Sequence, residues 1–394
     1  MKIAAAQTSP VWGDPEATSK VVAEWIRRAA DQGVDLLAFG ETFMSGYPYW
    51  MARTDGARWN APDQKEAYAY YLASAVAIDG PEIATIQETV RETGVFTYLG
   101  VTERSRSGGT VYATLLALDP TMGVVGAHRK LMPTYDERMA WGIGDGHGLR
   151  THQVGEFTVS GLNCWENWVP TIRHAMYAQG TQLHVAVWPG SVRNTRDITR
   201  FIALEGRCYV LSAGTILRAG DIPADFPARD ASLHSDDELL FDGGSAVAAP
   251  DGSWLVEPVA GEERLVTAEV DLGVVLLTGA ILVGGQIGLF INIPSILIVI
   301  GGTIAATFIR FSLNEVLGSI NVAMKAFFHK SKLPEETIKE IVTLANIARR
   351  EGLLKLEKQP IEDPFLKKAI MFCVDGHEAD FIEEVLSKEV QLTS

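Results

Sequence analysis

Residues 161–170, GLNCWENWVP, place a cysteine at the junction of two sequence patterns. The run before Cys164, FTVSGLN, is typical of a buried strand, and the run after it, WVPTIRHAMYAQG, is typical of a helix. Backbone N–H groups at the start of a helix lower the pKa of a thiol and stabilise a developing anion. Because an isolated cysteine is usually an inert packing residue, this position alone does not establish a nucleophile.

Two further stretches carry charged residues beside strand-like runs. Glu41 follows the apolar residues 34–39 in LLAFGETFMSGYPYW, and HRKLMPTYDERMAWGIGDG contains Lys130 and Glu137. Sheets bring residues near their strand ends to a common edge, where functional loops gather. A nucleophile, a carboxylate base and a cation are the parts that an acyl-transfer site needs. We therefore predict that Cys164 and these three residues form one catalytic site.

Residues 1–272 resemble the nitrilase superfamily of carbon–nitrogen hydrolases, because these three stretches occur in the family's order. The residues CWEN, together with FGETFMSGYPYW and ALEGRCYVLSAGT, resemble the nitrilase branch in particular. The resemblance implies a four-layer αββα sandwich, whereas the sequence periodicity by itself shows only an α/β architecture. It also implies hydrolysis of an organic nitrile to a carboxylic acid and ammonia through a cysteine thioimidate and a thioester. An aliphatic amidase of the same superfamily is the alternative.

This chemistry suggests a role for each charged residue. Cys164 would attack the nitrile carbon, and Glu41 would accept its proton and later activate water. Lys130 and the backbone N–H of Trp165 would stabilise the negative charge that develops. By the resemblance, Glu137 would position the lysine or the water. The alternatives are a buried ion pair for Glu41 and Lys130, and a surface carboxylate for Glu137.

Two tryptophans are candidates for substrate binding. Trp165 follows the nucleophile directly, and Trp188 in VWPG either lines the pocket or fills the core. No metal or organic cofactor is expected, because the proposed chemistry needs none and no histidine-rich spacing typical of a metal site is present.

Smaller patterns support the layered fold. KIAAAQ is typical of a buried strand, and Asp14 before Pro15 predicts the start of a helix that ends near Gly33. VDLLAFGE predicts the next strand, and YAYYLASAVAI and PEIATIQETVRETG predict two more helices. The pair Asp251–Gly252 between two apolar runs predicts a hairpin.

Composition limits the possible partners and compartments. The net charge of −15 over 394 residues argues against a nucleic-acid partner. Three cysteines form no disulfide framework and suit a reducing compartment. MKIAAAQTSPVWGD lacks the apolar core of a signal peptide, so we expect a cytoplasmic catalytic domain. The family resemblance also implies a homo-oligomer through the nitrilase half.

The composition changes abruptly after residue 271. Residues 272–309 contain no charged side chain, and the apolar segments 273–291 and 295–309 approach the roughly 20 residues that span a bilayer. We predict a transmembrane helical hairpin over residues 272–311, with a pair of buried globular helices as the alternative. Basic residues follow the second segment, which places both hairpin ends in the cytosol. The catalytic domain would then be tethered to the inner (cytoplasmic) membrane.

Residues 273–394 resemble the beginning of a MotA-type flagellar stator subunit, through GAILVGGQIGLFINIPSILIVIGGTIAATFIRF and ANIARREGLLKLE. That family has four membrane spans, and the later two, which build the proton path, are absent from this chain. Arg349 and Glu357 match in spacing the charged residues that the family uses against the rotor. Solvated helix charges are the alternative for this pair.

The two resemblances meet at residues 271–273 without a linker, and we interpret the chain as a chimera. We predict a catalytic domain over residues 1–271, the hairpin over 272–311 and a helical cytoplasmic segment over 312–394. A membrane motor or channel component with an inactive passenger domain is the competing function. The hydrolase half holds every catalytic group whereas the stator half lacks its ion path, so function should follow the hydrolase half.

Overall fold

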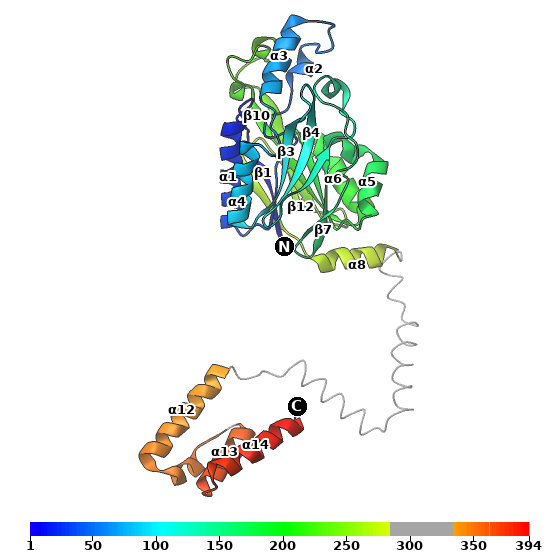
Figure 1. The fold of residues 1–394 in the computed structure, drawn as a ribbon. Coiled ribbons are helices and arrows are strands. Elements are labelled where there is room, and N and C mark those ends of the chain that lie inside the picture. The colour runs from blue at the N-terminus through cyan, green and yellow to red at the C-terminus, as the bar shows by residue number, and fades with distance from the viewer. Residues whose placement is uncertain (284–333, 362, 394) are drawn as a thin grey trace. The chain divides into compact units, whose positions relative to one another are not determined.

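The computed structural model describes residues 1–283, 334–361 and 363–393 (Figure 1). The chain divides into two compact units, Met1–Phe290 and Ile291–Ser394, and each is described by itself.

The first unit contains two β-sheets. The strands of the first sheet are, in spatial order, β13 (Arg264–Glu269), β1 (Lys2–Gln7), β2 (Leu36–Ala38), β3 (Phe96–Arg104), β4 (Val111–Asp119) and β5 (Gly123–Arg129). Those of the second are β10 (Ile216–Arg218), β11 (Leu239–Ala248), β9 (Tyr209–Gly214), β8 (Leu183–Trp188), β7 (Phe157–Asn163) and β6 (His152–Val154), with β12 (Trp254–Ala260) paired to β11. Both sheets have a parallel centre, β1–β2–β3 and β7–β8–β9.

Helices cover the outer face of each sheet. Figure 1 shows α1 (Pro15–Asp31) and α4 (Pro81–Thr93) on the first sheet, and α5 (Pro170–Tyr177) and α6 (Val192–Gly206) on the second. Helices α2 (Trp50–Arg53) and α3 (Pro62–Ala73) lie near one end of the strands (Figure 1), and α7 (Arg229–Ser232) packs against α2. The prediction of a four-layer αββα sandwich is confirmed.

Successive side chains of one strand pack into two different apolar cores, one on each face of the sheet. On β1, Ile3 and Ala5 belong to the core between the two sheets. The intervening Ala4 and Ala6 belong to the core between this sheet and α1 and α4. Because successive strand side chains point to opposite faces, a strand in the middle of such a sandwich is apolar throughout.

Local signals set most helix boundaries. Helix α1 begins at Pro15, and the Asp14 carboxylate accepts a hydrogen bond from the backbone N–H of Ala17 at 2.9 Å, as predicted for an N-cap. The expected helix over YAYYLASAVAI is partly wrong, because α3 ends at Ala73. Val76 pairs instead with Glu103 in an isolated bridge beside β3, so tertiary pairing overrides the local pattern.

The hairpin at Asp251–Gly252 is confirmed between β11 and β12, with Gly252 at a φ of 78°. After β13 the chain forms α8 (Leu272–Val283). The rest of the predicted hairpin, residues 284–311, lies outside the described residues. Within the described part of the chain, no helix combines the length and apolar character that crossing a membrane requires.

The described part of the second unit consists of helices around a small apolar cluster. Its elements are α12 (Pro334–Glu351), the 3₁₀ turn η4 (Leu353–Lys358), α13 (Pro364–Val374) and α14 (Ala379–Thr393). Leu344, Leu356 and Ile370 are its buried apolar residues. These helices agree with the helical character predicted for residues 312–394, of which residues 312–333 lie outside the described residues.

Candidate active site

The ends of three strands position the predicted catalytic residues. Glu41 lies three residues beyond β2, Lys130 directly follows β5, and Cys164 directly follows β7. Glu137 lies in the 3₁₀ turn η1 (Tyr135–Met139). These four side chains, 123 positions apart at most in the sequence, meet at one end of the sandwich, as the sequence predicted.

The turn that carries Glu41 packs unusually closely on β3. A Cβ atom at Gly100 would lie 2.1 Å from the carbonyl oxygen of Gly40 and 2.5 Å from the backbone nitrogen of Thr42. Only glycine therefore fits at this point of β3. The backbone N–H of Glu41 also donates to the carbonyl oxygen of Trp188 at 3.0 Å, which ties this turn to the second sheet.

Lys130 lies between two carboxylates. Its Nζ donates to Glu41 Oε1 at 2.9 Å and to Glu137 Oε2 at 2.6 Å, and all three side chains are buried. Burial disfavours the charged form of Lys130, but Glu41, Cys164 and Glu137 together raise the pKa of this ammonium above its usual range. A buried charge needs such pairing, so Lys130 is held as a cation.

Glu41 keeps one oxygen available for proton transfer. Burial, opposed by Lys130 and reinforced by Glu137, raises the pKa of Glu41 to about 8. Its Oε2 is buried and has no hydrogen-bond partner among the described residues. The Cys164 sulfur and a carboxylate oxygen from each of Glu41 and Glu137 all lie within 4.8 Å of one another. An unengaged carboxylate oxygen near a thiol is the arrangement that a general base requires.

Cys164 lies on a strained turn. Its φ is 43°, and Thr42 and Tyr135, next to Glu41 and close to Glu137 in sequence, have φ values of 46° and 47°. Residues other than glycine seldom adopt positive φ, and such strain gathers at functional sites. Burial and the charge of Glu41 raise the pKa of the thiol well above its usual value, against Lys130 and the backbone N–H of Trp165.

The helix-like run WVPTIRHAMYAQG, residues 168–180, forms α5, but Cys164 does not lie at the start of this helix as expected. A 3₁₀ turn, η2 (Cys164–Trp168), follows β7, and α5 begins only at Pro170. Proline suits the first position of a helix and disfavours helical backbone just before it, which explains where α5 begins. The thiol therefore does not benefit from the dipole of a long helix, and the contact from Trp165 N–H is local.

Glu166 is a buried residue near the site to which the sequence reasoning gave no role. Its carboxylate accepts hydrogen bonds from Leu131 N at 2.7 Å, from Asn163 N at 3.0 Å and from His128 Nε2 at 2.9 Å. Leu131 follows Lys130, and Asn163 precedes Cys164. Glu166 therefore links the backbone beside the nucleophile to the backbone beside the cation. The acidic residue of CWEN at a strand end was the available signal.

Tyr47 was also missed. Its hydroxyl donates to Glu137 Oε1 at 2.8 Å, while Thr134 N donates to Glu137 Oε2 at 2.6 Å. With Lys130, these donors fix the orientation of the Glu137 carboxylate, which is therefore buried and not the surface carboxylate of the alternative interpretation. Tyr47 lies in the Glu41 stretch, but nothing in the spacing distinguishes it from the neighbouring aromatic residues.

A cavity of about 450 Å³ opens onto Cys164. Trp165 is 52% exposed and stacks on Trp168 with the ring centroids 5.7 Å apart. Trp188 is buried in the core under α6, donates from Nε1 to Ser212 Oγ at 3.2 Å, and also borders the cavity. Both interpretations of Trp188 thus hold. The lining residues are Tyr47, Thr134, Glu137, Cys164, Trp165, Trp188, Pro189, Gly190, Ser191, Asn194, Leu239, Leu240, Phe241 and Asp242.

Residues 2–278 match the carbon-nitrogen hydrolase family. The chain belongs to this family. It is 40% identical over 267 residues to a protein named Nitrilase 2 from an unknown prokaryotic organism, covering 67% of this chain and 82% of that protein. It is 37% identical over 276 residues to an aliphatic nitrilase of Sinorhizobium fredii, covering 68% and 86% of the two chains.

Solved structures support the fold of this carbon-nitrogen hydrolase. A CN-hydrolase superfamily protein from Xanthomonas campestris has a TM-score of 0.55 at 19% identity, covering 73% of this chain and 97% of that one. A carbon-nitrogen hydrolase from Helicobacter pylori G27 has a TM-score of 0.56 at 14% identity, covering 71% and 92%. The family match ends at residue 278, so it gives no support to the stator resemblance or to the chimera.

Among the described residues of this carbon-nitrogen hydrolase, Glu41, Glu137 and Cys164 also have the geometry to hold a metal ion, because their ligand atoms lie within 4.8 Å of one another. The ammonium of Lys130 already donates to both carboxylates. The lysine therefore already neutralises part of the negative charge of Glu41 and Glu137 that would otherwise favour a metal ion at this position.

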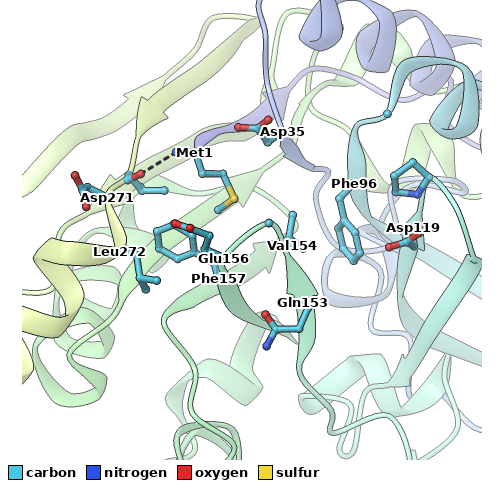
Figure 2. A pocket seen from close by; sticks show the side chains of 14 residues that line it. Met1, Asp35, Phe96, Asp119, Gln153, Val154, Glu156, Phe157, Asp271 and Leu272 are labelled. Carbon is cyan, nitrogen blue, oxygen red and sulfur yellow. Dashed lines mark hydrogen bonds between the residues drawn. The ribbon is translucent and has the colours of Figure 1, made fainter. Parts of the chain in front are cut away.

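The predicted rotor contacts belong to the second unit, and a second cavity lies in the first unit. Arg349 and Glu357, the predicted rotor contacts, are exposed in the second unit, and their role stays a prediction. A second cavity of about 560 Å³ lies where β1, β2, β3 and β7 begin, at the opposite ends of the strands from the catalytic cluster (Figure 2). There the Met1 amine donates to the carbonyl oxygen of Val270 at 3.0 Å, and Asp35 accepts from Lys2 N at 2.7 Å.

Proposed function

We propose that this protein hydrolyses an organic nitrile to the carboxylic acid and ammonia, with Cys164 as the nucleophile. The observation that carries the proposal is the grouping of the Cys164 sulfur with oxygens of Glu41 and Glu137 within 4.8 Å, around the doubly paired Lys130. The family membership and the relatives named nitrilases support the same reaction.

The first half of the reaction forms a covalent intermediate. The Cys164 sulfur attacks the nitrile carbon, and its proton passes to Oε2 of Glu41, which has no other partner in the described structure. Lys130 and the Trp165 backbone N–H stabilise the negative charge that develops on the nitrile nitrogen. Glu41 then passes the proton that it took from the thiol to that nitrogen, which gives a thioimidate and restores the Glu41 carboxylate. Glu137, held by Tyr47 and Thr134, keeps Lys130 in place.

The second half consumes two water molecules. Glu41 takes a proton from the first water as it adds to the thioimidate carbon. This proton and the remaining hydroxyl proton pass to the nitrogen, so that ammonia leaves the tetrahedral intermediate and a thioester remains. A second water, activated in the same way, cleaves the thioester, releases the carboxylic acid and returns the proton to the sulfur. An amide would enter the same route at the first tetrahedral intermediate, which is why an amidase is the alternative.

A panel of nitriles and their matching amides tests the proposal. Purified protein should release ammonia from at least one nitrile faster than from the corresponding amide. The Cys164→Ala variant should release none, while its melting temperature changes little, because the loss of one sulfur costs on the order of 1 kcal/mol. Turnover confined to amides would replace the nitrilase assignment by the amidase one. Residual nitrile turnover in Cys164→Ala would remove the nucleophile assignment.

We also propose that residues 272–311 associate with the membrane as a hairpin and that the catalytic domain forms homo-oligomers. The support for the membrane association is the sequence of residues 272–309, which has no charged side chain over a length suited to two spans. A stator-like role for Arg349 and Glu357 depends on the sequence resemblance alone. Fractionation of cells that express the full chain tests the membrane association.

A further inference from the structure

We propose that the catalytic pocket selects against nitriles that carry a carboxylate, and that Asp242 is the residue that sets this preference. The inference rests on the proposed function, because it names the class of substrate for the same site. The substrates that fit are uncharged or cationic nitriles, whereas cyano-carboxylic acids would be poor substrates.

The charges around the cavity carry the argument. Among the described residues that line it, Glu137 and Asp242 are carboxylates and none is a lysine or an arginine. The nearest cation of the catalytic cluster, Lys130, already donates to Glu41 and Glu137. The cluster and the cavity wall together therefore carry a net negative charge even when Glu41 is protonated. A substrate carboxylate would enter this field without a partner, which is costly in a partly dry pocket.

Asp242 is held in place by the fold. It lies on β11, and its Oδ1 accepts a hydrogen bond from the backbone N–H of Val192 at 2.9 Å, where α6 begins. No hydrogen bond to its other oxygen, Oδ2, is found among the described residues. That oxygen can accept a hydrogen bond from a substrate hydroxyl, amine or ammonium group, and it repels a carboxylate.

The rest of the wall favours uncharged groups. Trp165, Trp188, Pro189, Leu240 and Phe241 give the cavity an apolar and aromatic surface. Ser191 and Asn194 add neutral hydrogen-bonding groups at the start of α6. Apolar walls with a few placed polar groups are typical of small-molecule sites. In this cavity the charged lining residues are both carboxylates.

Two matched pairs of reagents test the proposal. The first pair is pentanenitrile and 4-cyanobutanoate, which differ in a terminal methyl or carboxylate group, compared by kcat/KM. The second pair is iodoacetamide and iodoacetate, compared by the rate at which each alkylates Cys164, measured by peptide mass spectrometry and normalised to 2-mercaptoethanol. The wild-type protein should favour the neutral member of each pair by about tenfold or more, the scale of one like-charge contact.

Asp242→Asn keeps an oxygen for the Val192 N–H but removes the charge, and it should reduce the preference in both pairs by on the order of tenfold. Asn194→Lys, which adds a cation to the wall without touching the Val192 bond, should shift both ratios in the same direction. Asp230→Asn is the matched control, because the Asp230 side chain is fully exposed on α7 and does not line the cavity.

Equal rates for the neutral and anionic reagents in the wild-type protein would overturn the inference, as would unchanged ratios in both Asp242→Asn and Asn194→Lys. The alkylation pair separates this outcome from failure of the proposed function. If no nitrile is hydrolysed but iodoacetamide still reacts preferentially at Cys164, the nitrilase assignment fails while the charge selection stands.

Discussion

Replacing Glu166 by glutamine should separate a positioning role from a merely structural one. In the structure one carboxylate oxygen accepts from Leu131 N at 2.7 Å and the other from Asn163 N at 3.0 Å. Glutamine has a single oxygen, so whichever way the amide is turned, its NH₂ group faces one of these two backbone N–H groups. Either Asn163, next to Cys164, or Leu131, next to Lys130, therefore loses its hydrogen bond to the side chain at position 166.

The size of the effect follows from these contacts. A hydrogen bond to a charged group contributes about 1.5–3 kcal/mol, and a buried donor left without a partner costs about 1–3 kcal/mol. Because these two quantities describe the same lost contact, we expect Glu166→Gln to lower the free energy of unfolding by about 2–3 kcal/mol. Since a displacement of about 1 Å at a reacting atom costs on the order of 100-fold in rate, kcat should fall by about that factor. KM should change little, because Glu166 does not line the cavity.

The pH profile of kcat/KM distinguishes a positioning role of Glu166 from a purely structural one. The negative charge of Glu166 is one of the causes that raise the pKa of Glu41, after burial and Glu137. Its removal should therefore move the acidic limb of kcat/KM to lower pH. Steady-state kinetics from pH 6 to 10 and thermal melts would be measured on Glu166→Gln and on Glu156→Gln, an exposed carboxylate just before β7. A lower melting temperature with unchanged kcat and an unshifted limb would refute the positioning role.

Three further predictions concern the buried charges and the membrane. In the wild-type protein kcat/KM should rise with pH through about 8, because Glu41 must be ionised to act as a base and its pKa is raised to about 8; a flat profile from pH 6 to 9 would contradict this. Lys130→Met should lower kcat by about 100-fold or more and also lower the melting temperature, since Glu41 and Glu137 would be left buried without their cation; wild-type kcat with a lower melting temperature would instead favour a purely structural ion pair. Full-length protein should pellet with membranes through residues 272–311 and dissolve only in detergent, and recovery of an active oligomer without detergent would contradict the hairpin.

The sequence could place those residues of the candidate site that directly follow a predicted strand. Glu41, Lys130 and Cys164 each follow an apolar run, so the sheet alone brings them to the same edge. Glu166 and Asp242 could not be placed in this way, because their partners are distant in the sequence. Glu166 contacts residues 35 and 38 positions earlier, and Asp242 contacts a residue 50 positions earlier. Such contacts depend on which turns meet after the sheets have packed, and periodicity carries no information about that.

The same limit explains the errors in secondary structure. The apolar run after α3 has a helical composition, but Val76 pairs beside β3, because an unpaired backbone near a sheet edge gains more from the ladder than from another helical turn. Directly after Cys164, the 3₁₀ turn η2 separates the thiol from α5, which begins at Pro170. The cysteine therefore lies on a strained turn and not at the start of the helix that the local pattern predicted.

Lys130 links the catalytic chemistry to the choice of substrate. A thiol and two carboxylates within 4.8 Å would repel one another if all were ionised, and the lysine between the carboxylates relieves this repulsion. The positive charge is thereby used inside the cluster, and little of it reaches the cavity that Asp242 borders. A nitrile is uncharged when it enters and becomes negative on nitrogen only as the Cys164 sulfur attacks. Lys130 therefore acts on the charge that develops during the reaction and offers little to an anion already present on the substrate, which is the selectivity expected of a site that binds the transition state better than the substrate.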